Sequence, residues 1–301
     1  MLGNVPNRRF NRIPRPSGLG PWLIAPCLLL LVLFAYKPLV RTFELSFYGS
    51  DLFGNATRFV GLEHYSELFT DGAMRQAVLT TILITVLAVT LSVGGALAAI
   101  LPLRNKLPGA AFFRVIFSLP FAFSAAVASA AFAGLLAPSV GTLNQLLAHL
   151  GITGPAWLQS SGWAIASVVA ATAWYEFGFA ALVVTAAVRS LPGDVMEAAA
   201  LDGATGWRLN RSVVIPQIAP SIFFLVVTQT ISGLQIFAQV QVLTRGGPAG
   251  STSTMVFELY QRAFGTGVPD YGRASALAMT LLALVAVVTV VQFAVRRRIG
   301  A

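Results

Sequence analysis

The stretch that decides the fold is Ala77–Leu103, with the sequence AVLTTILITVLAVTLSVGGALAAILPL and no charged residue. A helix needs about 20 mostly apolar residues to cross the hydrocarbon core of a bilayer. This stretch therefore predicts one membrane span. Five further apolar stretches meet the same criterion, namely Pro21–Val40, Val115–Leu136, Gly162–Val188, Pro220–Leu243 and Ala274–Val295. The pattern predicts an all-α, polytopic membrane protein with six transmembrane helices.

The composition of the whole chain agrees with this class. Of its 301 residues, 56% are hydrophobic and 10% are charged, and the mean hydropathy is +0.76. Soluble domains carry about 25% charged residues, so a cytosolic enzyme, a nucleic-acid-binding module and a disordered protein are all disfavoured. The net charge of +9 comes from basic residues beside the apolar stretches, which indicates contact with a lipid bilayer and not with nucleic acid.

The distribution of basic residues predicts the orientation. With both termini in the cytosol, thirteen basic residues lie on the inner side and seven on the outer side, as the positive-inside rule requires. The expected organisation is a cytosolic tail (1–20), a six-span domain (21–295) and a basic cytosolic tail (296–301). The outer connections, Arg41–Ala73 and Thr244–Arg273, are long enough to contain short helices.

The connection between the third and fourth spans contains a further apolar face, formed by Leu143, Leu146, Leu147 and Leu150. At helical spacing these side chains lie together. They predict a short helix that either lies in the membrane interface or packs on neighbouring spans.

Residues for chemistry are scarce. Cys27 is the single cysteine, and the two histidines, His64 and His149, stand far apart. The two lysines, Lys37 and Lys106, are not in a glycine-rich phosphate-binding loop. We expect no catalytic residue, no metal site and no cofactor bound by this chain, and hence no enzyme.

The most informative loop is 191–216, LPGDVMEAAALDGATGWRLNRSVVIP. Asp194 can cap a first helix that contains Glu197, and Gly203 can end that helix in a left-handed conformation. Thr205 can cap a second helix, which should end at or before Ile215 because Pro216 follows. The first helix bears small side chains, so it either sits in a partner's groove or is an ordinary connector.

The fifth span carries an unusual number of polar side chains. Ser232, Gln235 and Gln239 share one helical face with Thr228, and Gln229 flanks it. Hydrocarbon cannot satisfy these groups, so the stripe predicts a solute path or hydrogen bonds between subunits.

On the fourth span, Glu176 is the single ionisable group. It is either functional or locally hydrogen-bonded to a neighbouring helix. The adjacent Tyr175 and Phe179, with Trp174, could supply aromatic faces to a sugar.

The loop also resembles a known signature. It contains Glu197-Ala198-Ala199, then Gly203 after three residues, and Val213-x-Ile215-Pro216 after nine more. This pattern is similar to the "EAA" motif of bacterial ABC-transporter permeases. Four further segments resemble positions of the carbohydrate-uptake (MalF/UgpA-like) branch, namely Leu201–Ala204, Gly246–Pro248, Ser251–Thr254 and Pro138-x-x-Gly141. The resemblance extends from the first span to the end of the chain.

The resemblance implies a multi-pass permease subunit in a bacterial inner membrane. It implies ATP-driven import of a sugar, polyol or glycerol-phosphate, with ATP used by separate ATP-binding subunits. The implied partners are a second related permease and an extracytoplasmic solute-binding protein. The residues implied to couple to the ATPase are Glu197, Ala198, Ala199, Asp202 and Gly203. The alternative is an ion-coupled secondary transporter, which would need inverted repeats and paired membrane carboxylates.

Overall fold

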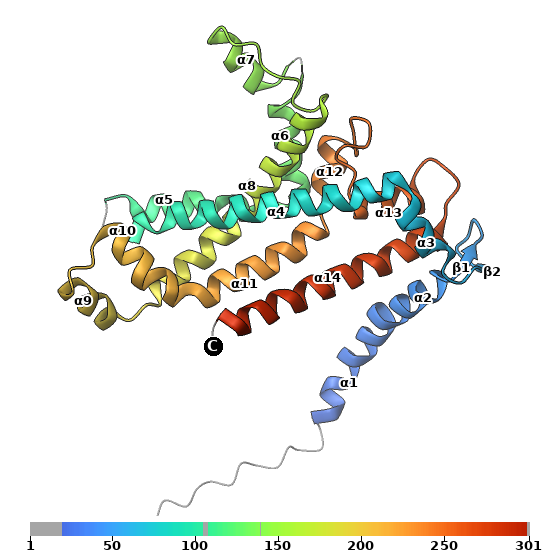
Figure 1. Ribbon diagram of the computed structural model, residues 1–301, viewed down its shortest axis with the longest axis horizontal. Helices are drawn as coiled ribbons and strands as arrows, with labels where there is room; N and C mark the ends of the chain where they lie inside the picture. Colours follow the sequence, from blue (N-terminus) through green and yellow to red (C-terminus); the bar gives the residue numbers. More distant parts are fainter. Residues whose placement is uncertain (1–19, 105–107, 139, 300–301) are drawn as a thin grey trace, which may run out of the picture.

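The computed structural model describes residues 20–104, 108–138 and 140–299 (Figure 1). Apart from Gly20, the expected N-terminal tail lies outside this part of the chain, as do the last two residues. The order of elements is α1 Gly20–Leu31, π-helix η1 Val32–Tyr36, α2 Lys37–Leu45, β1 Tyr48–Ser50, β2 Ala56–Phe59, α3 Glu63–Thr70, α4 Gly72–Ile100, η2 Pro102–Arg104, α5 Ala110–Ser118, η3 Leu119–Ala122, α6 Ala125–Leu135, α7 Thr142–His149, α8 Ser161–Arg189, α9 Gly193–Leu201, α10 Gly206–Leu209, π-helix η4 Asn210–Val214, α11 Ile215–Leu234, α12 Ala238–Leu243, α13 Met255–Phe264 and α14 Tyr271–Ile299.

The helical class is confirmed, and the described residues contain five helices that are long and apolar enough to cross a membrane. They cover 23–45, 72–104, 161–189, 206–234 and 271–298. One antiparallel hairpin, β1–β2, is added in the first outer connection. The expected third span, Val115–Leu136, is not a straight helix.

That third span is broken because two helical pieces, 110–122 and 125–135, meet at 101°. Pro120 lies in the 3₁₀ turn η3, and Phe123 and Ser124 have extended backbones. The Ser124 hydroxyl accepts a hydrogen bond from the Val127 amide and so caps α6. Counted as one bent span, this pair completes the expected six.

The fifth span also differs from the prediction at both ends. The second helix of the loop does not stop before Pro216, because α10 continues through the π-helical turn η4 into α11. Pro216 is the second residue of α11, directly after this irregular turn. A proline at this place in a continuous helix removes one backbone hydrogen bond, and the π-helical turn lies where that bond would be made. At the other end α11 stops at Leu234, and α12 is a separate helix.

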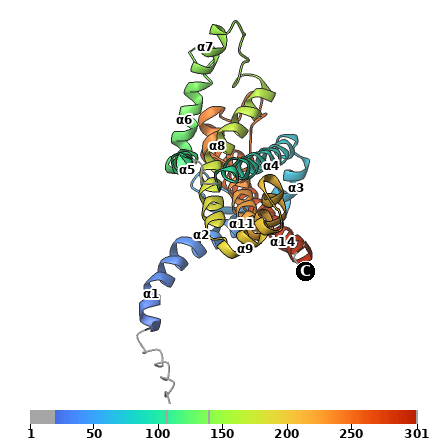
Figure 2. The same ribbon diagram turned by 90° about the vertical axis from the view of Figure 1, so that its left-hand side faces the viewer.

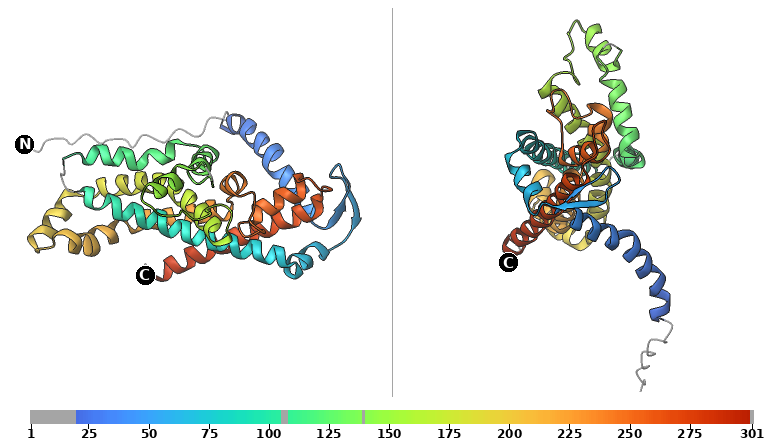
Figure 3. Two further views of the ribbon diagram at one scale, coloured as in Figure 1. Left: turned by 90° about the horizontal axis from the view of Figure 1, so that it is seen from above. Right: turned by 90° about the vertical axis from the view of Figure 1, so that its right-hand side faces the viewer.

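The core is formed by α4, α8 and α11, which run side by side (Figures 1 and 3). Ala96 on α4 and Ala180 and Ala181 on α8 are completely buried there. Small side chains let helices approach closely in a membrane, where packing and not the hydrophobic effect drives association. At Gly233 a Cβ atom would come within 2.8 Å of the Thr85 side chain, so α11 also closes tightly on α4.

Two parts of the chain leave this bundle. Figure 2 shows α6 and α7 extending to one side and α1 to the other. The apolar side chains of α1 are exposed throughout its described length. The expected leucine helix exists as α7, but Leu146 and Leu150 are exposed. Leu143 and Leu147 are half-buried and α7 contacts α6, so the leucine face is only partly covered within this chain.

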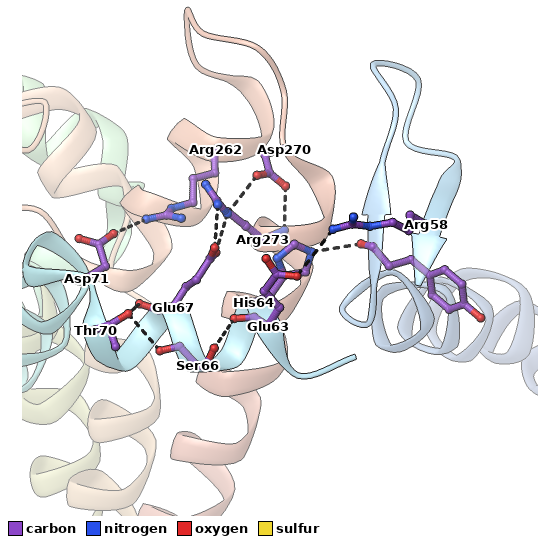
Figure 4. A network of polar contacts seen from close by, with 11 residues as sticks. Arg58, Glu63, His64, Ser66, Glu67, Thr70, Asp71, Arg262, Asp270 and Arg273 are labelled. Carbon is purple, nitrogen blue, oxygen red and sulfur yellow. Dashed lines mark hydrogen bonds and ion pairs between the residues drawn. The ribbon is translucent and has the colours of Figure 1, made fainter. Parts of the chain in front are cut away.

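Charged side chains join the helices at the end of the bundle that carries α3 and α13, called here the outer end after the predicted topology (Figure 4). Arg262 on α13 pairs with Asp71 at 3.1 Å, and Arg273 on α14 pairs with Glu67 on α3 at 2.8 Å. Partial burial raises the pKa of Asp71, but hydrogen bonds from the Ala73 amide and Arg262 outweigh it, and the pKa is lowered. The ion pair between Asp71 and Arg262 therefore stabilises the fold at neutral pH, and its contribution is lost as the pH falls through the lowered pKa of Asp71.

The orientation can be tested by thiol labelling after Cys27→Ala. Phe53, 87% exposed at the tip of the hairpin, and Arg298, exposed at the end of α14, are suitable sites for single cysteines. Ser251, in the second outer connection, is unsuitable because only 7% of it is exposed. We expect an impermeant maleimide to label a cysteine at position 53 in whole cells and one at position 298 only in inverted vesicles. The reverse pattern would contradict the orientation.

Candidate coupling loop and translocation surface

The loop 191–216 forms the far inner end of the molecule, beyond the ends of α4 and α5 (Figures 1 and 3). Asp194 was predicted to cap the first helix of the loop. That helix, α9, instead begins at Gly193, so Asp194 lies in its first turn. A carboxylate in that position still interacts favourably with the helix dipole. The end of α9 is as expected: Gly203 has φ +73°, and the Ala204 amide donates to the Ala199 carbonyl at 3.0 Å.

The expected coupling residues differ in their surroundings. Glu197, Ala198, Asp202 and Gly203 are exposed. Ala199 is buried and packs in a small cluster with Ala204 and Leu209. Ala199 therefore holds α9 onto the start of the fifth span, and the other four residues form the surface that a partner could contact.

Sequence reasoning missed two members of this surface. Leu201 is 89% exposed and Trp207 is 68% exposed at the inner end. Tryptophan is enriched among the residues that dominate the energy of protein–protein interfaces. Their position within the loop that is predicted to be cytosolic, outside any apolar span, was the available signal.

At membrane depth the polar side chains of α11 fall into two groups. Ser232 is exposed and lies near the Glu176 side chain on α8. Gln235 follows the last residue of α11 and is also exposed. Tyr175 and Phe179, on either side of Glu176 along α8, are half-buried. These five residues from α8 and the end of α11 are the candidate translocation surface.

Gln229 belongs to the second group, because it is 1% exposed and all its polar atoms are used inside the chain. Its Oε1 accepts from the Ser92 hydroxyl on α4, and its Nε2 donates to the Glu176 carbonyl at 3.0 Å. Gln239 is also buried, on the separate helix α12. The expected single stripe fails because the helix ends at Leu234, and helical spacing does not extend across the break.

Aromatic rings surround this surface. Phe179 lies 5.4 Å from Phe121 and 6.5 Å from Phe224, measured between ring centroids. Trp174 contacts Phe123 in the same way, at 6.1 Å. The break in the third span brings Phe121 and Phe123 here, and sequence reasoning did not include either residue. The sequence signal for the break was Pro120 within an apolar stretch.

The break is seated on α8 at Gly178. A Cβ atom at this position would lie 2.4 Å from the Phe121 amide nitrogen, so only glycine permits the contact. Gly178 thus sets the distance between the bent span and the residues around Glu176. Within the described residues, no group of three or more histidine, cysteine or carboxylate side chains could hold a metal ion.

Comparison with known proteins identifies the family. Residues 92–301 match the family described as "Binding-protein-dependent transport system inner membrane component". The sn-glycerol-3-phosphate transport system permease protein UgpA of Agrobacterium fabrum is 31% identical over 92% of this chain and 94% of the relative. The sulfoquinovosyl glycerol transport system permease protein SmoG of the same organism is 32% identical over 91% of this chain and 89% of the relative.

The fold is also similar to a solved structure. A chain of a bacterial ABC transporter involved in the import of the acidic polysaccharide alginate superposes with a TM-score of 0.78, at 22% identity, over 93% of this chain and 97% of that chain. The matched family covers more than half of the sequence, and the relatives named are permease subunits and not enzymes. The chain therefore belongs to the binding-protein-dependent ABC-transporter permeases, as an inner-membrane, membrane-spanning subunit.

Proposed function

We propose that this permease forms one half of the path through which an ATP-driven importer takes up a sugar, a polyol or a glycerol-phosphate. The observation that carries the proposal is the similarity to UgpA and SmoG along more than nine tenths of the chain. Both relatives are named for transport of glycerol derivatives. An ion-coupled secondary transporter, the alternative from the sequence, does not belong to this family.

The partners follow from what the chain lacks and what it exposes. No phosphate-binding loop is present in the sequence, so ATP-binding subunits must supply the energy. Ser232 and Gln235 are exposed polar groups at membrane depth, and such groups need protein or water as neighbours. A second, related permease that faces them would complete the path. The family description supports a solute-binding protein on the outer side.

Energy enters, in this proposal, through the exposed face of α9. Glu197 and Ala198 lie on α9, and Asp202 and Gly203 follow its last residue, Leu201. Leu201 and Trp207 add apolar area for the ATPase to cover. Because Ala199 fixes α9 to Leu209, a displacement of α9 is transmitted to the helix that continues from α10 through η4 into α11. The same helix bears Ser232 at its other end.

The solute, in this proposal, passes over Tyr175, Glu176, Phe179, Ser232 and Gln235. Hydroxyl groups of a sugar or polyol can exchange hydrogen bonds with the serine, the amide and the carboxylate. The aromatic rings provide faces for the C–H side of the same solute. Gln229 and Gln239 are left out of the path because they are buried in this chain.

The function is tested by transport in proteoliposomes that contain the complete complex. Uptake of radiolabelled glycerol-3-phosphate and of neutral sugars should require internal ATP and the solute-binding protein. It should persist when ionophores remove the proton and sodium gradients. Uptake that collapses with either gradient while ATP is present would contradict the proposal.

The coupling surface is tested with Ala198→Trp and Gly203→Val. Ala198 is exposed, so a large side chain disturbs only a partner that covers it. Valine at φ +73° is strained by about 1 kcal/mol or more. We expect both variants to abolish uptake, either by loss of the ATPase subunit or by uncoupled hydrolysis. Ala198→Ser and Gly193→Ala, in the same loop, are the matched controls and should retain uptake. Normal transport by both test variants would reduce the loop to a connector.

The path is tested by comparing exposed with buried polar residues. Ser232→Ala and Gln235→Leu should lower uptake at least tenfold without loss of assembly, because solute hydroxyls lose partners. Gln229→Leu removes two hydrogen bonds between helices, one with Ser92 Oγ and one with the Glu176 carbonyl, and it should cost about 1–3 kcal/mol of stability. The measurements are uptake and the thermal midpoint of the purified complex. If Ser232→Ala prevents assembly, the exposed residues form a subunit contact.

A further inference from the structure

A small cavity lies at the inner end of the bundle, where α4, α5 and α8 come together. Its volume is about 160 Å³. The residues that line it are Ile100, Arg104, Arg114, Thr185, Val188 and Arg189. Three arginines from distant parts of the sequence thus face one cavity at the cytosolic boundary of the membrane.

No carboxylate balances these three charges within the described residues. The arginines that form ion pairs among the described residues are Arg41, Arg58, Arg262 and Arg273, and all four lie toward the outer end. The acidic residues nearest in sequence to Arg189 are Asp194 and Glu197, which are exposed on α9. Like charges that share a partly buried cavity repel each other, so the arrangement favours an anion as occupant.

Hydrogen-bonding capacity at the cavity is also unused. Nη1 of Arg104 and Oγ1 of Thr185 are buried and have no hydrogen-bond partner among the described residues. Arg114 differs, because its Nη2 donates to the Leu103 carbonyl at 2.6 Å and the side chain is thereby held in place. Buried donors without partners are unfavourable, and an anion with several acceptor oxygens would satisfy them together.

We propose that this cavity binds a phosphate group. The guanidinium fork matches phosphate oxygens in geometry and charge, and the Thr185 hydroxyl supplies a further donor. The phosphate of an anionic phospholipid at the inner membrane surface and free phosphate in the cytosol present the same chemistry. The site is separate from the coupling surface, because α9 lies further out than the ends of α4 and α5 (Figure 3). That separation also favours phosphate over an acidic side chain of the ATPase.

The test uses the complete transport complex in nanodiscs. In one arm the lipid is phosphatidylcholine alone, and binding of radiolabelled inorganic phosphate is measured. In the other arm the nanodiscs also contain phosphatidylglycerol, the complex is then released into detergent and washed, and the phosphatidylglycerol that stays bound to each complex is counted by native mass spectrometry. Saturable binding in the first arm identifies free phosphate as the source, and retained phosphatidylglycerol in the second identifies the lipid. Either result supports the site.

Variants locate the binding. Arg104→Gln should weaken it about tenfold or more. Thr185→Val should weaken it about threefold without lowering the thermal midpoint of the ligand-free complex, since its hydroxyl has no hydrogen-bond partner in the part of the chain that the structure describes. Arg297→Gln is the matched control, because it removes the same charge from an exposed position at the end of α14, outside the cavity. It should bind as the unmodified complex does.

Three results would overturn the proposal. The first is the absence of binding in both arms. The second is an equal loss in Arg297→Gln and Arg104→Gln, which would mean general attraction to a basic surface. The third is dissociation of the ATPase subunit from Arg104→Gln alone, since the arginines would then hold a carboxylate of that subunit.

Discussion

The hydrogen bonds of Gln229 join the three helices on which the rest of the structure depends. One amide side chain connects α11 to Ser92 on α4 and to the Glu176 backbone on α8. In a membrane interior no water competes for these groups, so an unpaired amide is costly and the pairing fixes how the helices are rotated. That rotation turns Ser232 toward the Glu176 side chain. The buried amide thus positions the exposed polar surface without belonging to it.

Breaks in the helices have a similar positioning role. The third span bends at Pro120–Ser124 and lies directly on Gly178, which brings Phe121 against Phe179. The fifth span stops at Leu234, immediately before Gln235. Non-helical backbone at membrane depth is tolerated where it is buried in protein or lines a water-filled path. Both breaks border the surface around Glu176, as expected for a path through the membrane.

The arginines at the two ends of the molecule differ in whether they are paired with carboxylates. At the outer end, arginines pair with carboxylates and join α3, α13 and α14. At the inner end, Arg104, Arg114 and Arg189 share a cavity without such partners among the described residues. The outer end is therefore held together by the chain's own charges, whereas the inner end is suited to an external anion and, through α9, to a partner protein.

Residue order alone predicts the helical class, the approximate spans and the loop that resembles the EAA motif. Each depends on local information: apolar length, the placement of glycine, and residue spacing within one segment. The end of α9 at Gly203 was predictable for this reason. The start of α9, the bend at Pro120 and the continuation through Pro216 were not. Proline allows either a break or a first helical turn, and the packing of neighbouring helices selects between them.

Only the tertiary structure decided the roles of individual polar residues. Gln229 and Ser232 are three residues apart on one helix, yet one is buried and the other exposed. Ala198 and Ala199 differ in the same way. The arginine cavity joins positions 104, 114 and 189, which no local pattern relates. The physical reason is that burial and hydrogen bonding depend on which helix lies opposite, and in a chain of nearly uniform apolar spans that choice is made by packing between distant segments.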